Sequence, residues 1–204
     1  EAPAYKIASP ELIDLQLIKK VASTGKPIIM SIGAATLDEI EEAIQTARDG
    51  GTNDIIVLHC TAAYPAPPEE ANLVNISKLA KTYDVVAGLS DHTLGTTVPI
   101  LAVGMGASLI EKHFTLSRAD GGVDSAFSLE PNEFSELISG AKIAYSSIGK
   151  FNLKPTKSES TVIMNRRSLY VVKPIIKGEI FTKENIKSIR PANGIKPKFY
   201  NDIL

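Results

Sequence analysis

Residues 54–61 (DIIVLHCT) and 84–93 (DVVAGLSDHT) contain the pattern that decides the fold, a short apolar run that ends in a histidine and polar residues. Residues 107–116 (ASLIEKHFTL) repeat this pattern, and two further apolar runs occupy residues 4–9 and 26–33. Short apolar runs rich in Val and Ile, bounded by polar or turn-forming residues, are typical of buried strands. We therefore expect five strands in the first part of the chain.

The segments between these runs have the spacing of amphipathic helices. Apolar residues recur three and four positions apart in residues 10–23, and Thr36 with Glu39 predicts a capping box at the start of the next helix. The buried stripe of that helix is expected to comprise Ile40, Ala43, Ile44 and Ala47. Further helices are expected within residues 69–83, 97–107 and 130–149. Strands that alternate with helices in this way are typical of a parallel sheet.

Two parallel architectures fit this alternation, an open doubly wound sheet and a (β/α)8 barrel. No G-x-G-x-x-G sequence follows a strand, so the dinucleotide-binding form of the open sheet lacks its fingerprint. Residues capable of chemistry instead end every expected strand: Lys6 and Ser9, Ser31, His59 and Thr61, Ser90 and His92, Glu111 and His113. Barrels distribute their chemistry over successive strand ends, and about eight strands are needed to close one. We therefore predict that residues 1–149 form the carboxyl-terminal five β/α units of a TIM barrel, with the first three units absent.

The sequence changes character after the last expected helix. Residues 150–163 are polar and are expected to form a linker. Residues 164–204 contain short β-like runs, a Lys-Gly turn and a helix start over residues 182–185, which together predict a small, incomplete α+β domain. The chain begins at Glu1 rather than Met and stops soon after a helix-like start, so we expect both ends to be cut.

Composition argues against several classes of protein. The formal net charge is −1, which does not favour a nucleic-acid-binding surface, and no apolar run reaches the roughly 18 residues of a membrane span. Cys60 is the only cysteine, so a disulfide within the chain is impossible and a reducing, cytoplasmic compartment is expected. Because Cys60 follows His59 on one strand, the two side chains should point to opposite faces. We expect a buried structural thiol rather than a Cys–His nucleophile.

Two histidines are candidates for a metal site. Residues two apart on a strand share a face, so Ser90 and His92 should point one way, as should Glu111 and His113. Adjacent parallel strands lie about 4.8 Å apart, so both imidazoles can reach one divalent cation if their strands are neighbours. Two ligands alone are a weak signature, and hydrogen-bonded rim histidines are the alternative. His59 is expected to be structural or to support a ligand from behind.

Lys6 lies among apolar strand residues, where an unpaired charge is costly to bury. Inside a barrel it needs an anion, either an acidic side chain or a bound phosphate or carboxylate. Ser31 and Ser90 end other strands and can donate hydrogen bonds to the same anion. Asp124, in a glycine-rich loop, is expected to accept hydrogen bonds from sugar hydroxyls; an unliganded turn carboxylate is the alternative.

A set of motifs, taken in order and spacing, resembles one enzyme family: YKIAS, S-x-G, HCT-x-x-YP, GLSDHT, EKHFT and G-x-DSAFSLEP. These motifs resemble the sialic acid synthase family, and DSAFSLEP is most similar to its pseudaminic acid synthase branch. The tail, with RSLYVVK, KGE, T-x-EN and IRPANG, is similar to the antifreeze-like (SAF) domain of that family. The resemblance extends over essentially the whole chain and implies a TIM barrel followed by a SAF domain.

The resemblance implies condensation of phosphoenolpyruvate with an N-acetylated amino sugar, 2,4-diacetamido-2,4,6-trideoxy-altrose in the pseudaminic branch, to give a nine-carbon acidic sugar and phosphate. A divalent ion, Mn²⁺ or Mg²⁺, held by His92 and His113 would activate the sugar's aldehyde. The residues implied to hold phosphoenolpyruvate are Lys6, Ser9, Ser31 and Ser90. The residues implied to face the sugar are Glu11, Tyr64 and Asp124, with Glu11 and Asp124 as the catalytic candidates. Arg190 would reach into the partner's site in a domain-swapped homodimer.

Departures from the family pattern affect the substrate site. Ile32 stands where the family has Thr, and Ala62 stands where it has a polar residue near phosphoenolpyruvate. A glutamate and a second lysine from the family's first strands are missing. We therefore predict that the 204-residue chain is catalytically inactive and exposes sheet edges. N-acetylneuraminate or legionaminate synthesis is the alternative within the enzyme class, and a noncatalytic sugar-binding protein is the alternative outside it.

Overall fold

The computed structural model describes residues 2–204, and the chain divides into two compact units, residues 1–149 and residues 150–204. The first unit contains one parallel sheet whose five strands pair in chain order, β1-β2-β3-β4-β5. The strands are β1 (Tyr5–Ile7), β2 (Ile28–Ser31), β3 (Ile55–Cys60), β4 (Val86–Asp91) and β5 (Ile110–Lys112). Each of the five lies inside the apolar run that predicted it.

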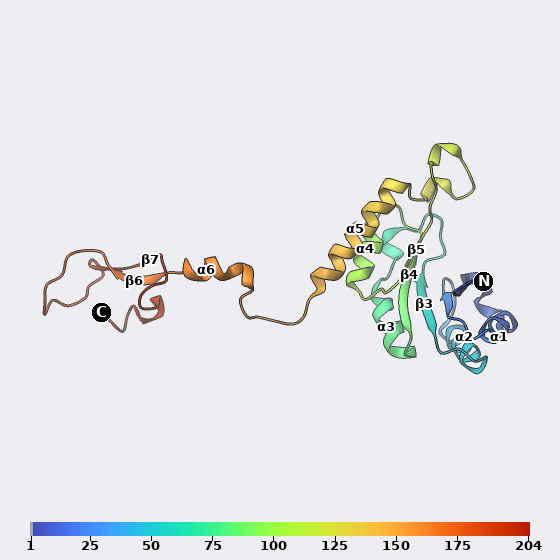
Figure 1. Cartoon of the computed structure of the whole chain (residues 1–204), viewed down its shortest axis with the longest axis horizontal. Helices are drawn as coiled ribbons and strands as arrows, with labels where there is room; N and C mark the ends of the chain where they lie inside the picture. The colour runs from blue at the N-terminus through green and yellow to red at the C-terminus, as the bar shows by residue number, and fades with distance from the viewer. Residues whose placement is uncertain (1) are drawn as a thin grey trace. The chain divides into compact units, whose positions relative to one another are not determined.

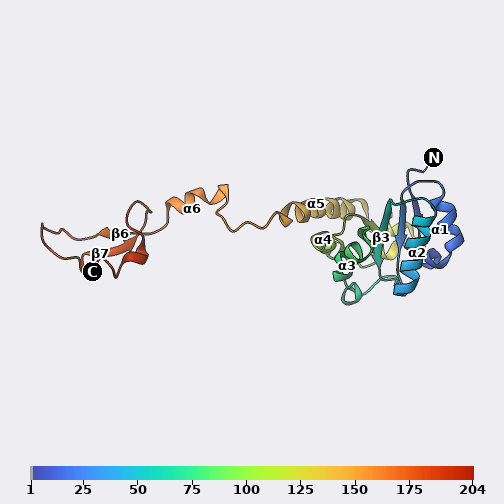
Figure 2. The same ribbon diagram turned by 90° about the horizontal axis from the view of Figure 1, so that it is seen from below.

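Four helices connect successive strands and a fifth follows the last one. They are α1 (Leu15–Ala22), α2 (Leu37–Asp49), α3 (Val74–Tyr83), α4 (Thr97–Gly104) and α5 (Pro131–Ile148). Parallel strands joined in chain order by right-handed crossovers place every connecting helix on the same face of the sheet. Figures 1 and 2 show α1 to α4 following one another along the outer side of the curled sheet. A doubly wound sheet has helices on both faces, so the predicted barrel architecture, five β/α units of a half-barrel, is confirmed.

Strand alternation gives the sheet two different faces. On the outer face, beneath the helices, Ile28, Met30 and Val57 are completely buried. On the inner face, Ile29 is half-buried and Val86 is 48% exposed. The apolar core of this unit therefore lies between the sheet and its helices, and the inner face remains available for other contacts.

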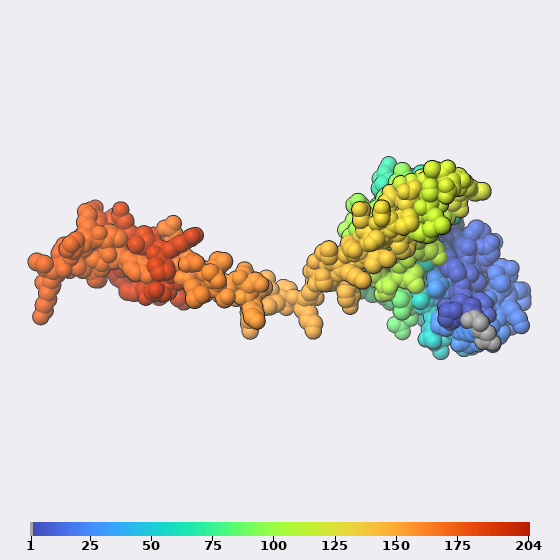
Figure 3. All heavy atoms as spheres, turned by 45° about the horizontal axis from the view of Figure 1, so that its top comes forward, coloured from blue at the N-terminus to red at the C-terminus, as the bar shows by residue number. Residues whose placement is uncertain are grey.

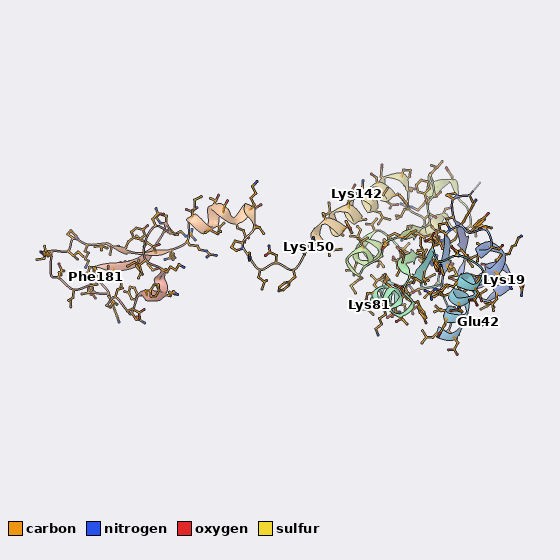
Figure 4. The ribbon with its side chains drawn as sticks, turned by 60° about the horizontal axis from the view of Figure 1, so that its bottom comes forward. Lys19, Glu42, Lys81, Lys142, Lys150 and Phe181 are labelled. Atoms are coloured by element: carbon orange, nitrogen blue, oxygen red, sulfur yellow. The ribbon has the colours of Figure 1, made fainter. Side chains whose placement is uncertain are left out.

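The start of α2 follows the predicted capping box. Thr36 Oγ1 accepts a hydrogen bond from Glu39 N (3.3 Å), and Glu39 Oε2 accepts one from Thr36 N (2.7 Å). All four predicted stripe residues are buried against the sheet: Ile40, Ala43, Ile44 and Ala47. On the outer side of the helical layer, Lys19, Glu42 and Lys81 point away from the sheet (Figure 4). This division of apolar and polar faces fixes each helix on the sheet.

The first expected helix is divided in two. Ser9–Ile13 form a 3-10 helix, and α1 begins only at Leu15. The carboxylate of Asp14 accepts a hydrogen bond from Leu17 N (3.0 Å) and so caps a new helix start. Apolar spacing continues through this junction, which is why periodicity alone predicted one helix.

Gly88 lies on the inner face of β4, beside Leu58 of β3. A methyl group at this position would lie 2.7 Å from Leu58 Cδ2 and would overlap the carbonyl oxygen of Leu109. That carbonyl accepts a hydrogen bond from Leu89 N (2.9 Å), which begins the pairing of β4 with β5. The absence of a side chain therefore permits the close approach on which this pairing depends.

After β5 the chain forms a long loop and then α5. Two 3-10 helices, Arg118–Asp120 and Ser125–Phe127, lie in this loop. Figure 3 shows the surface of α5, in gold, beside the green surface of α4, against which it packs. The loop therefore lies at the carboxyl ends of the strands, before the chain returns along the helical layer.

Among the described residues, no helix combines the length and apolar character needed to cross a membrane.

The second unit contains a two-stranded antiparallel sheet of β6 (Ser168–Val171) and β7 (Ile186–Ile189). A 3-10 helix at Lys157–Glu159 and α6 (Ser160–Met164) precede it, so the later part of the expected linker is helical. A further 3-10 helix, Pro197–Phe199, lies near its end.

The helix start expected over residues 182–185 is wrong. Asn185 Oδ1 accepts a hydrogen bond from Thr182 N (2.7 Å), and Thr182 Oγ1 accepts one from Asn185 N (3.3 Å). These bonds close a turn that leads directly into β7. Thr and Asn make the same local bonds at turns and at helix starts, so the sequence pattern does not separate the two.

The two units carry opposite net charges. Residues 150–204 contain 12 Lys and Arg but four Asp and Glu, a formal net charge of +8. Residues 1–149 contain ten Lys and Arg and 19 Asp and Glu, a formal net charge of −9. The near-neutral total therefore conceals a strongly acidic unit and a strongly basic one.

Candidate active site

The inner face of the sheet carries a polar network that joins four strands. Lys6 Nζ donates a hydrogen bond to Ser31 Oγ (2.8 Å) and lies 3.4 Å from Glu111 Oε1. Ser90 Oγ donates to the same carboxylate oxygen (2.7 Å). Glu111 therefore supplies the anion that the sequence position of Lys6 requires. The ammonium and hydroxyl groups around this oxygen form a set of donors suited to a bound phosphate or carboxylate.

Ser9 and Cys60 extend this network at the ends of β1 and β3. Ser9 Oγ accepts a hydrogen bond from Gly33 N (2.9 Å), and Cys60 Sγ lies 3.8 Å from His92 Nδ1. Burial would raise the pKa of Cys60, but hydrogen bonds with His92, Ser9 and Ser90 outweigh it and lower that pKa. Cys60 is buried, but it lies on the inner face of the sheet, where its neighbours are the polar residues of this network.

His92 and His113 lie together at the ends of β4 and β5. Their ring centroids are 5.2 Å apart, and the Tyr64 ring lies 4.3 Å from His92 and 5.9 Å from His113. Phe127 lies 5.0 Å from His113 and 5.8 Å from Tyr64. A hollow of about 280 Å³ is lined by Ser90, Asp91, His92, Glu111, Lys112 and His113. The two imidazole rings therefore border a small polar cavity, which Glu111 of the Lys6 network also lines.

The two histidines differ in their hydrogen bonding and charge. His92 Nδ1 lies 3.0 Å from the Thr61 carbonyl oxygen, and because a carbonyl only accepts, this nitrogen carries the proton. Burial would lower the pKa of His92, but hydrogen bonds with Cys60 and Thr61 outweigh it and raise that pKa. Burial, together with the charge on His92, lowers the pKa of His113. His113 Nδ1 lies 3.6 Å from Asp124 Oδ2.

His59 lies on the opposite face of the sheet from this pair. Its Nε2 lies 2.8 Å from the Ala71 carbonyl oxygen, and its side chain is 8% exposed. Burial lowers the pKa of His59, and the hydrogen bond to Ala71 offsets this only in part. His59 is therefore a neutral, hydrogen-bonded histidine beneath the helical layer.

The structure brings most of the sequence-predicted site residues together. The residues at one rim are Lys6, Ser9, Ser31, Tyr64, Ser90, His92, His113 and Asp124. Glu11 is exposed in the 3-10 helix after β1, and within the described residues its side chain makes no hydrogen bond or ion pair with the rim. Arg190 is exposed in the second unit, just after β7.

Sequence reasoning left three residues of this region without a role. Glu111 is the shared acceptor of Lys6 and Ser90, and Asp91 forms a buried ion pair with Lys112. The signal was present, because all three lie within two residues of a predicted ligand. Their contacts can be inferred only once the strand register is known, because it pairs Ser90 with Glu111 and Asp91 with Lys112.

The histidine pair has the donor chemistry of a partial metal site. Within the part of the chain that is described, no group of three or more His, Cys, Asp or Glu side chains is arranged to hold an ion. Two imidazoles fit a cation whose other ligands are substrate and water oxygens. The Nδ1–H of His92 is held by Thr61, which leaves Nε2 to bind, and the lowered pKa of His113 favours the unprotonated ligand.

Comparison with known protein families decides the relationship of the chain. Residues 1–152 match the NeuB family, and residues 166–204 match the SAF domain. The chain belongs to the NeuB family. The predicted membership and the predicted SAF domain are thus confirmed.

Named relatives of this NeuB-family chain include synthases of several acidic sugars. It is 46% identical to the pseudaminic acid synthase of Helicobacter pylori, over 99% of this chain and 60% of that protein. It is 41% identical to the N,N'-diacetyllegionaminic acid synthase of Campylobacter jejuni, over 98% of this chain and 61% of that protein. The crystal structure of the N-acetylneuraminic acid synthetase of Leptospira borgpetersenii matches 79% of this chain and 56% of that chain, with 35% identity and a TM-score of 0.73. The chain spans about three fifths of the length of the curated relatives it matches.

Proposed function

We propose that this chain carries the carboxyl-terminal part of the active site of a pseudaminic acid synthase. The reaction would condense phosphoenolpyruvate with 2,4-diacetamido-2,4,6-trideoxy-altrose, with water adding at C2 of phosphoenolpyruvate and phosphate leaving. One observation carries the proposal: a lysine–hydroxyl network and a pair of histidines lie at the same inner rim of the sheet. In the network, Lys6 Nζ lies 3.4 Å from Glu111 Oε1, the oxygen that also accepts a hydrogen bond from Ser90. The 46% identity to the Helicobacter pylori protein named for this activity supports the choice of sugar.

The network would bind the anionic groups of phosphoenolpyruvate. Lys6 provides charge, and Ser31 and Ser90 provide hydroxyl donors that stabilise phosphate as the C–O bond breaks. Glu111 holds these donors in the absence of substrate, so its carboxylate would have to turn aside when the anion binds. Ser9 would assist by orienting the Gly33 N–H and the loop that follows β2.

The histidine pair would receive the sugar's aldehyde. A divalent cation, Mn²⁺ or Mg²⁺, would be held by His92 and His113 and, when bound, would polarise the aldehyde oxygen for attack by C3 of phosphoenolpyruvate. Tyr64 would cover both imidazoles and exclude water from them. Asp124, beside His113, would accept hydrogen bonds from sugar hydroxyls, and Glu11 would join them from the loop after β1.

We further propose a domain-swapped homodimer in which Arg190 enters the partner's site. The formal charges of −9 on residues 1–149 and +8 on residues 150–204 support this arrangement, because opposite charges favour the encounter of one copy's second unit with another copy's first. The free thiol of Cys60 suits a reducing, cytoplasmic compartment.

The proposal is tested by joining the amino-terminal β/α units of the Helicobacter pylori relative to this chain, so that a barrel can close. With Mn²⁺ and phosphoenolpyruvate present, phosphate release is expected with 2,4-diacetamido-2,4,6-trideoxy-altrose. The variant His113→Gln should lose this activity, whereas Lys142→Gln, exposed on α5, should retain it. The 204-residue chain alone is expected to release none.

The outcomes also separate the competing assignments. Phosphate release with N-acetylmannosamine instead of the altrose sugar would replace the pseudaminic assignment with N-acetylneuraminate synthesis. Release with the legionaminate precursor alone would favour that branch. Binding of a sugar without any phosphate release would favour a noncatalytic sugar-binding protein.

A further inference from the structure

A buried ion pair lies directly behind the two histidines. Asp91 and Lys112 end β4 and β5 and face each other in the strand register. Lys112 Nζ lies 2.6 Å from Asp91 Oδ2, and the two side chains are 1% and 2% exposed, respectively. Because successive strand residues point to opposite faces, this pair lies on the outer face while Ser90 and Glu111 lie on the inner face. Two polar networks of different character are therefore one residue apart.

The same pair holds the main chain on the far side of His92. Asp91 Oδ1 accepts a hydrogen bond from Thr93 N (3.0 Å), and Lys112 Nζ donates one to the Thr93 carbonyl oxygen. Thr93 is itself buried, with 2% exposure. The pair therefore ties down the residues on both sides of His92 and the residue directly before His113.

Stability alone does not explain this arrangement. Desolvating two charges costs as much as, or more than, their attraction returns, and apolar residues of similar volume often stabilise a core equally well. The best-attested use of such groups is to select one geometry among several. Here the selected geometry is the main-chain path that places the ring centroids of His92 and His113 5.2 Å apart. Groups behind metal ligands orient them in the same way.

We propose that Asp91 and Lys112 are positioning residues, which hold His92 and His113 in the arrangement that binds a divalent cation. The identity of the ligand rests on the proposed function. The arrangement of the two rings does not, because it is measurable without any metal.

The decisive variant of the 204-residue chain is Asp91→Asn/Lys112→Met. Its amide still accepts a hydrogen bond from Thr93 N, its thioether fills the space of the lysine stem, and no single charge is left buried. Its thermal midpoint is expected to stay close to that of the parent. Leu137→Ala, at a buried position on α5, controls for a general loss of packing. Lys112→Arg, which retains the charge and the donors, is the rescue variant.

The first measurement is the ¹H–¹³C NMR spectrum of the histidine rings, which contains only three sets of signals because the chain has three histidines. In the double variant the signals of His92 and His113 are expected to shift or broaden. In Leu137→Ala and Lys112→Arg they are expected to match those of the parent. Unchanged His92 and His113 signals in the double variant would overturn the proposal.

The second measurement is Mn²⁺ binding, followed by water-proton relaxation. Loss of a group that supports a metal ligand typically weakens affinity by about 10- to 100-fold, and this range is expected for the double variant. Equal affinity in a parent and a double variant that both bind Mn²⁺ would assign the pair a purely structural role. If the parent binds no Mn²⁺, the proposed cation chemistry fails, and the ring signals alone decide whether the pair positions the histidines.

Discussion

The two faces of the same five-stranded sheet have different chemistry. The outer face is buried under helices, with Ile28, Met30 and Val57 fully inaccessible, and the ion pair between Asp91 and Lys112 on this face is sealed from solvent. The inner face has half-exposed apolar side chains and a network in which Lys6 and Glu111 are 30% and 41% exposed. Partners on the outer face are fixed, whereas partners on the inner face can exchange with a ligand.

This difference shows that alternate residues of one strand serve stability and function separately. The outer face determines where the strand ends lie, and the inner face determines what they bind. Removing a buried apolar side chain from the outer face should therefore change the free energy of unfolding. A substitution of a partly exposed inner-face residue such as Lys6 should change ligand affinity and leave the fold nearly unaltered.

The largest effect is expected for Asp91→Ala, which leaves the Lys112 ammonium buried without its counter-charge. Breaking a buried pair in this way costs about 3–5 kcal/mol in the free energy of unfolding. Urea denaturation followed by circular dichroism measures the loss. Arg118→Met is the control, because its pair with Glu133 is 38% and 37% exposed and is expected to contribute about 1 kcal/mol or less. Equal losses in both variants would contradict the distinction between sealed and exposed pairs.

The neighbouring residues Met30 and Ile29 compare the two faces within one strand. Met30→Ala removes a completely buried side chain and is expected to cost about 2–5 kcal/mol. Ile29→Ala removes a half-buried side chain from the inner face, and about 1 kcal/mol is expected. Urea midpoints of the two variants give the ratio directly. A larger loss for Ile29→Ala would mean that the inner face is packed in solution.

The burial of His59 on the outer face predicts that the free energy of unfolding depends on pH. Burial lowers its pKa in the folded chain below the ordinary value of 6.5, so the unfolded chain takes up a proton first as the pH falls. The contribution of His59 is therefore complete above pH 6.5 and is lost towards its folded pKa, with a slope of at most about 1.4 kcal/mol per pH unit. His59→Gln should reduce the slope of unfolding free energy between pH 7.5 and pH 5.5. An unchanged slope would exclude His59 as its source.

The smallest effects on stability are expected for Lys6→Met and Glu111→Gln. Their ion pair is partly exposed, so each variant should change the free energy of unfolding by less than about 1 kcal/mol. Their effects on binding should have opposite signs, since one removes the cation that attracts an anion and the other removes the carboxylate that competes with it. Calorimetry with phosphoenolpyruvate should show weaker binding for Lys6→Met and tighter binding for Glu111→Gln. Weaker binding in both would make Glu111 a contributor to the anion site.

Much of the sheet could be predicted because its strands are short, apolar and bounded by polar residues. The capping box at Thr36 and the stripe beneath α2 followed from local rules, which depend on residues close in sequence. The division at Asp14 and the turn at Thr182 did not, because the same side chains form caps, turns and helix starts. Caps, turns and helix starts differ in backbone geometry rather than in residue type.

The site was predictable where the relevant residues sit at strand ends. Lys6, Ser90 and His113 could be placed on one rim from alternation and strand order alone. The partners of these residues could not, because Glu111 lies on β5, at the opposite edge of the sheet from Lys6 on β1. The pairing of Asp91 with Lys112 likewise depends on a register that no single strand reveals.

Gly88 has a consequence for how this chain tolerates mutation. It has no ligand to bind and no charge to place, yet any side chain there would overlap Leu109 and crowd Leu58. In a library covering every position, substitutions of Gly88 should therefore be depleted as strongly as substitutions of a residue with a chemical role. A second substitution at Leu58 should not rescue them, because the obstacle at Leu109 is main chain. The least tolerant position of β4 would then be one that contributes only empty space.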